Sequence, residues 1–116
     1  PKATPAKHQG TPYGEEVTGT PMAVGSFLEQ ASALEGEIVT LEGVLGHVCD
    51  MGCWFFLTDP DARTESGQPV KLYIDLQGGA VFTIPNTSAG KRAVVQGRVA
   101  KNNNGWKLVG RGVVLS

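Results

Sequence analysis

Residues 37–49, EIVTLEGVLGHVC, decide the fold, because from Glu37 onward the hydrophobic pattern repeats every two residues. A period of two places alternate side chains on opposite faces of an extended chain, so this stretch predicts one long strand. Gly43 and Gly46 lie within it. Glycine in a strand marks a place where the backbone bends or bulges, as strands of small barrels must.

Four more stretches of this kind follow along the chain. They read CWFFLTD at residues 53–59, VKLYIDL at 70–76, KRAVVQGRVA at 91–100 and WKLVGRGVVLS at 106–116. Turns are predicted at a polar loop, PDARTESGQP, and at the sequence NNNG, while AVFTIP is expected to be a short extended piece. Strands joined mostly by hairpins predict an all-β chain that forms a small five-stranded barrel of the oligonucleotide/oligosaccharide-binding (OB) type. A β-sandwich is the alternative.

One amphipathic helix is expected before the barrel. Thr20 is a suitable cap, Pro21 suits the first helical position, and Gly36 suits the end. Apolar residues between them recur at helical spacing, namely Val24, Phe27, Leu28, Ala31 and Leu34.

The first nineteen residues, PKATPAKHQGTPYGEEVTG, contain almost no large apolar side chain. Such a segment buries too little surface to offset its ordering entropy, so residues 1–19 are expected to be a flexible leader and residues 20–116 the barrel domain. Its His8 is expected to be solvated. We interpret the leader as a linker from an export signal or a lipid anchor upstream, which places the chain in the bacterial envelope, periplasmic or secreted.

Composition excludes some classes of function. The chain has 116 residues, 18% charged residues and a formal net charge of -1, so it lacks the basic field that draws a protein onto nucleic acid. No stretch approaches the roughly 18 apolar residues of a membrane span.

A cluster of sulfur and imidazole side chains lies in residues 47–54, HVCDMGCW. His47, Cys49, Met51 and Cys53 occupy alternate positions, and in a straight strand the two cysteines would be about 13 Å apart, too far to share an ion or a disulfide. Asp50 and Gly52 favour a turn, which would bring the sulfurs together.

Three interpretations of this cluster stay open. The cysteines form a structural or redox-active disulfide, they bind a metal ion, or they remain reduced and buried as small apolar residues. Two thiolates, a thioether and an imidazole are soft ligands, which select copper(I). Cys49 and Cys53 with either His47 or Met51 would suffice for that ion.

Zinc is less well matched than copper(I), because it takes four ligands and the fourth would have to be Asp50, the distant His8 or water. No cofactor is expected if the cysteines form a disulfide. Trp54, beside the cysteines, is a candidate shield for the ion, although Trp54, Phe55, Phe56 and Leu57 are read first as barrel core. Asp59 and Asp61 lack the full spacing of a calcium loop.

The order of several pieces resembles a known family. GVLGHVCDMGCWFFLTD, then VKLYIDL, FTIP and AGKRAVVQGRV, is similar to a family of small bacterial secreted or periplasmic domains of unknown function with an OB-like fold. The resemblance spans roughly residues 13–114, and it implies an exported protein without an established activity. Its central signature falls on these residues: Val44, Val48, Cys49, Gly52, Cys53 and Trp54.

The sequence therefore predicts an exported domain, not an enzyme, that binds or relays a soft metal ion, copper(I), through the CxxxC turn. A ligand-binding or protein-binding module whose cysteines are disulfide-bonded is the alternative. The partner would be an unknown protein or metal acceptor, with no nucleic acid and no transmembrane segment.

Overall fold

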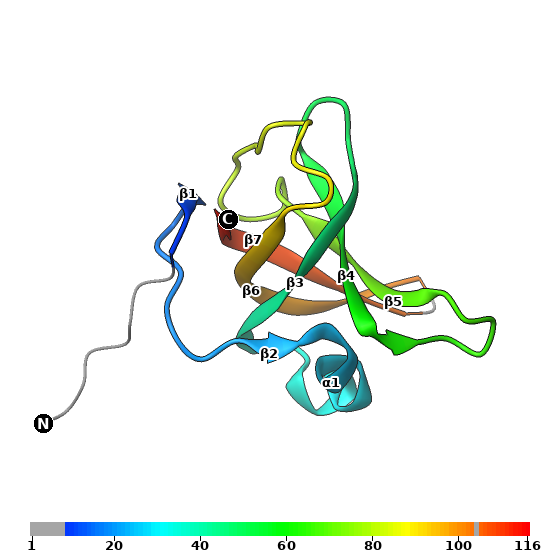
Figure 1. The fold of residues 1–116 in the computed structure, drawn as a ribbon. Helices are drawn as coiled ribbons and strands as arrows, with labels where there is room; N and C mark the ends of the chain where they lie inside the picture. Colours follow the sequence, from blue (N-terminus) through cyan, green and yellow to red (C-terminus); the bar gives the residue numbers. More distant parts are fainter. Residues whose placement is uncertain (1–8, 104) are drawn as a thin grey trace, which may run out of the picture.

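Five long strands close into a barrel in the computed structural model, which describes residues 9–103 and 105–116 (Figure 1). The strands are β3 (Ile38–Val48), β4 (Trp54–Arg63), β5 (Pro69–Asp75), β6 (Arg92–Asn102) and β7 (Gly105–Leu115). β3 pairs with β4, β4 with β5, β5 with β7, β7 with β6, and β6 returns to β3. All these pairs are antiparallel except β5 with β7. This closed order confirms the predicted OB-like barrel.

The core fills the inside of this barrel. Alternate residues of each strand point inward, so that Leu41 and Leu57 are fully buried and Leu45 is nearly so. β3 can serve two neighbours because its first half pairs with β6 and its second half with β4, and the register with β4 shifts between Leu45 and Val48. The expected bend in this strand is thus a bulge.

Two short strands cover edges that the barrel leaves open. β1 (Thr11–Gly14) pairs with the last residues of β7, beyond the point where β5 ends, and β2 (Met22–Ala23) pairs with β3. Val17, between them, is only 3% exposed. The prediction of a flexible leader is therefore wrong for residues 11–17, because main-chain pairing and the burial of Val17 order a segment that its composition marks as polar. Residues 1–8, with His8, lie outside the described part of the chain.

The helix is shorter than its pattern predicts. α1 (Val24–Glu29) ends at Glu29, and a separate turn of 3-10 helix, η1 (Ala31–Leu34), carries the remaining apolar positions. Residues 22–23 are extended because they pair with β3, so neither Thr20 nor Pro21 begins the helix. Gly36, with φ of +85°, does end the helical region as expected. In Figure 1 the helix lies below the barrel, at the end opposite the β3–β4 turn.

The connections also differ in part from the prediction. β4 continues through Pro60 to Arg63 with an irregularity in its pairing, so the expected polar loop shrinks to a tight turn. Residues 80–85 form no strand. Between β6 and β7, Asn103 has a positive φ of 52°, and Asn104 lies outside the described residues. No helix in the described ranges has the length and hydrophobicity of a membrane span.

Candidate functional site

The β3–β4 turn holds both cysteines, and its backbone is closely hydrogen-bonded. The Cys49 amide donates to the Trp54 carbonyl (2.9 Å), and the Gly52 amide donates to the Cys49 carbonyl (2.8 Å). Gly52 has a φ of +73°, a conformation that glycine adopts without strain. The predicted bend at residues 50–52 is confirmed.

A second segment of the chain, residues 76–86, fixes this turn from the side. The Ile84 amide donates to the Gly52 carbonyl (3.0 Å), and the Leu76 amide donates to the Cys53 carbonyl (3.0 Å). The Asn86 side-chain amide donates to the Asp50 carbonyl (2.9 Å). The backbone of the cysteine turn is therefore positioned by tertiary contacts as well as by its own hydrogen bonds.

The two thiols lie side by side. Their sulfur atoms are 3.2 Å apart, both cysteines are free, and both are partly exposed. The hydrogen bond from the Cys53 thiol, followed by one from the Met51 amide, lowers the pKa of Cys49. The same thiol–thiol bond, followed by burial, raises the pKa of Cys53. Cys49 is thus the thiol that ionises first.

The other residues predicted for the site are placed differently. The His47 ring contacts the Trp54 ring at a tilt, with ring centroids 5.5 Å apart. Met51 lies at the tip of the turn and is 77% exposed. Asp50, predicted beside the site, is contacted through its backbone carbonyl, which accepts the hydrogen bond from Asn86. Across residues 9–103 and 105–116, no three side chains of His, Cys, Asp or Glu form a group that could hold a metal ion. The assignment of His47 or Met51 as a ligand stays a prediction.

Half of the expected aromatic core lies outside the barrel. Phe55 and Leu57 are fully buried, but Trp54 and Phe56 point to the outer face and are half-buried. There they meet Tyr73 of β5, with centroid distances of 5.4 Å from Trp54 and 5.9 Å from Phe56. Burial, and next the charge of Asp75, raise the pKa of Tyr73. The alternation of strand residues could have placed Trp54 and Phe56 on the face opposite Phe55. Tyr73, by contrast, reaches Trp54 and Phe56 only through the pairing of β4 with β5.

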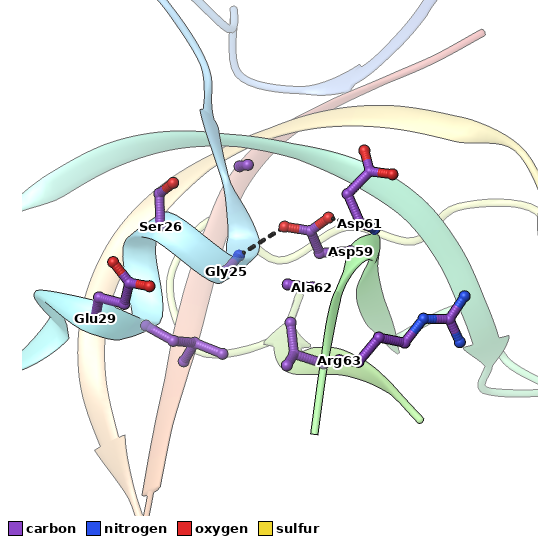
Figure 2. Close-up of a pocket in the computed structure, with 10 residues that line it drawn as sticks. Gly25, Ser26, Glu29, Asp59, Asp61, Ala62 and Arg63 are labelled. Atoms are coloured by element: carbon purple, nitrogen blue, oxygen red, sulfur yellow. Dashed lines mark hydrogen bonds between the residues drawn. The ribbon is translucent and has the colours of Figure 1, made fainter. Parts of the chain in front are cut away.

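A hollow beside α1 lies at the end of the barrel opposite the cysteine turn, and the carboxylate of Asp59 that lines it has a structural role. Figure 2 shows Asp59 of β4 pointing at the start of the helix, where its carboxylate accepts the Gly25 amide at 2.8 Å. Its second oxygen accepts the Asp61 amide at 3.0 Å, and the side chain is largely buried. A carboxylate placed this way caps a helix that has no side-chain cap of its own. Both carboxylate oxygens are thus already used in the fold.

Comparisons with known proteins add little to this description. No family model matches the chain, and no curated protein sequence matches it. Among solved structures, that of the hypothetical protein YgiW from E. coli is similar, with 18% identity, coverage of 84% of this chain and 91% of that chain, and a TM-score of 0.49. The OB-like assignment rests on this chain's own strand order, and membership of the family with the cysteine signature stays a prediction.

Proposed function

We propose that this protein binds or relays a soft metal ion, copper(I), through the thiolates of Cys49 and Cys53. The observation that supports the proposal most directly is the separation of 3.2 Å between the two sulfur atoms on a turn whose backbone is fixed by neighbouring residues. Metal–thiolate bonds are about 2.3 Å long, as measured for zinc, so two sulfurs bound to one ion lie at most about 4.6 Å apart. Linear coordination would require the sulfurs to separate by about 1.4 Å from their present 3.2 Å.

The ligand chemistry favours copper(I) over harder ions. Thiolates are soft ligands, whereas magnesium and calcium take oxygen ligands. Zinc takes four ligands, and copper(I) is satisfied by two or three. Two thiolates, with Met51 or His47 as the candidate third ligand, match that lower number.

Reversible disulfide formation is the second candidate, and the same separation of the sulfurs favours it. A disulfide requires the sulfurs to approach from 3.2 Å to about 2.05 Å. Attack by the Cys49 thiolate on a disulfide of a partner would give a mixed disulfide and release one partner thiolate. Attack by Cys53 would then release the second, leaving the pair oxidised and the partner reduced.

The discriminating experiment is an anaerobic copper(I) titration of the reduced protein against a colorimetric copper(I) chelator. We expect one equivalent to bind and to protect both thiols from alkylation. Cys49→Ser/Cys53→Ser should weaken binding at least about 100-fold, and Met51→Leu or His47→Gln should weaken it only if that side chain is the third ligand. Unchanged copper affinity in the double-cysteine variant would refute the proposal.

Intact mass of the protein purified without reductant tests the second candidate. A mass lower by two hydrogens, with no copper retained after reduction, identifies a disulfide and rejects the copper site. In either case we propose, from the resemblance and the composition of the leader, that the chain functions in the bacterial envelope. If the copper site holds, we propose that another protein receives the ion.

A further inference from the structure

The outer face of β3, β4 and β5 carries a strip of aromatic rings beside the thiol centre. His47, Trp54 and Tyr73 follow one another across β3, β4 and β5, with successive centroid distances of 5.5 Å and 5.4 Å. Phe56 packs edge-on against Trp54 at 5.6 Å. We call these four residues the aromatic strip.

The strip crosses the strands rather than following one of them. Phe56 is paired with Tyr73, and Tyr73 with Lys107 of β7, so the side chains on this face line up from β3 towards β7. In OB barrels, the face formed by the second and third strands binds extended oligomers across the sheet. Here the second and third barrel strands are β4 and β5.

The side chains of the strip are half-exposed, apart from His47, which is exposed. Tryptophan and tyrosine rings with one apolar face and a polar tip are typical of surfaces that bind ligands rather than of solvated ones. An apolar cluster on the outside of a barrel has no role in the core. Cross-strand contacts between these rings stabilise the sheet, and their half-exposed faces are also free to contact a ligand.

The charges around the strip are nearly balanced. Lys107 pairs with Asp75 at 3.5 Å, and the Lys71 ammonium lies over the Phe56 ring, 4.4 Å from its centroid. Lys107 thus already has a carboxylate partner, the Lys71 ammonium lies against a ring of the strip, and the whole chain has a net charge of -1. A polyphosphate strand needs several cations along its path, so the charge of this face matches a neutral ligand.

From these observations we infer that the aromatic strip binds a neutral oligosaccharide. Pyranose rings present flat faces of C–H groups that stack on aromatic rings, while their hydroxyls accept and donate hydrogen bonds. The ion-paired Asp75 and Lys107, on β5 and β7, lie beside Tyr73 and would supply such partners, as would the Tyr73 hydroxyl. Successive rings of the strip would each contact successive sugar units. This inference does not depend on copper binding.

The test uses the reduced, chelator-treated chain, so that its outcome is independent of the metal. Cellohexaose, chitohexaose, maltohexaose and laminarihexaose are titrated by calorimetry, with Trp54 fluorescence followed in a Trp106→Phe background. We expect at least one of these sugars to bind, and Trp54→Ala to weaken its affinity about tenfold or more. Trp106→Ala is the matched control, because Trp106 is the only other tryptophan of the chain and lies outside the strip. It should leave affinity unchanged.

Tyr73→Leu is the second variant, and it removes a ring while keeping an apolar side chain in case Trp54→Ala lowers stability too far. Thermal unfolding of each variant establishes that it is folded. The inference is overturned if none of the four sugars binds to the folded protein, or if neither strip variant weakens binding. Salt-dependent binding of an oligothymidine that is lost in Trp54→Ala would also overturn it, in favour of single-stranded nucleic acid.

Discussion

The β3–β4 turn and the β4–β5 turn have similar backbones but very different surroundings. In each, the amide of a glycine with positive φ, Gly52 (+73°) or Gly67 (+88°), donates to the carbonyl three residues earlier. The β4–β5 turn is held by its own residues: Thr64 bonds to the Ser66 hydroxyl and to the Gln68 backbone, and the Arg63 side chain donates to the Gly67 carbonyl. The cysteine turn is instead fixed by residues 76–86.

The two turns also differ in length by one residue. The Thr64 amide bonds to the carbonyl four positions later, and the Cys49 amide to the carbonyl five positions later. Cys53 is the additional residue, and its sulfur lies beside that of Cys49. The thiol pair therefore lies on a turn that is one residue longer than the β4–β5 turn and that residues 76–86 contact.

The largest expected effect is on stability. Gly52→Ala should lower the free energy of unfolding by about 3 kcal/mol, because a Cβ there would overlap the Ile84 carbonyl oxygen in addition to straining the backbone. Gly67→Ala should cost only about 1 kcal/mol, since that glycine has nothing within 4 Å of the added carbon. Urea unfolding of both variants measures the difference. Equal losses would mean that residues 76–86 do not fix the cysteine turn.

Moving the thiols tests whether the turn matters beyond its spacing. In a Cys49→Ser/Cys53→Ser background, Thr64→Cys/Gln68→Cys restores the CxxxC spacing on the locally held turn. We expect copper(I) affinity there to be about tenfold weaker than in the native protein, because less of the ligand geometry is set in advance. The chelator competition measures both affinities. Equal affinity would show that the tertiary contacts are irrelevant to binding.

Alkylation rates test the difference between the two thiols. Near neutral pH, iodoacetamide should modify Cys49 before Cys53, because its lowered pKa gives it more thiolate. Cys53→Ala removes the main cause of that lowering, so the pKa of Cys49 rises and its labelling should slow about threefold. The difference should vanish at alkaline pH, where both forms are ionised. Peptide mass mapping over time follows each site, and faster labelling in the variant would contradict the assignment.

Single side-chain contacts should have smaller effects on stability than the glycine substitutions. Asn86→Ala removes the bond to the Asp50 carbonyl and should lower the free energy of unfolding by about 1 kcal/mol. Ser66→Ala, on the locally held turn, should change it by less than about 0.5 kcal/mol. Both follow from urea midpoints. A larger loss for Ser66→Ala would reverse the comparison.

Much of the barrel could be predicted because its strands carry a local signal. Period-two patterns and glycine positions located the five long strands and the turn that brings Cys49 near Cys53. β1 was not predicted, since its order comes from pairing with β7, about a hundred residues away. The helix was predicted too long because spacing alone cannot show that Met22 and Ala23 pair with β3 instead.

The aromatic strip as a whole was not predicted for a similar reason. A run of four apolar residues, WFFL, reads as core, and only the direction of each side chain separates Trp54 and Phe56 from Phe55 and Leu57. Tyr73 is remote in sequence and joins the strip through the register of β4 with β5.

The pairing of β1 with β7 determines how this domain would respond to force. Thr11 lies opposite Leu115 and Gly14 opposite Gly112, so tension applied between residues 11 and 115 loads the rungs of this ladder one after another, starting at Thr11. Such a geometry peels open at low force, whereas strands pulled along their length share the load. β1 would therefore separate from β7 first and lengthen the chain between the two pulling points. The five-stranded barrel, with the cysteine turn that follows β3, would stay closed.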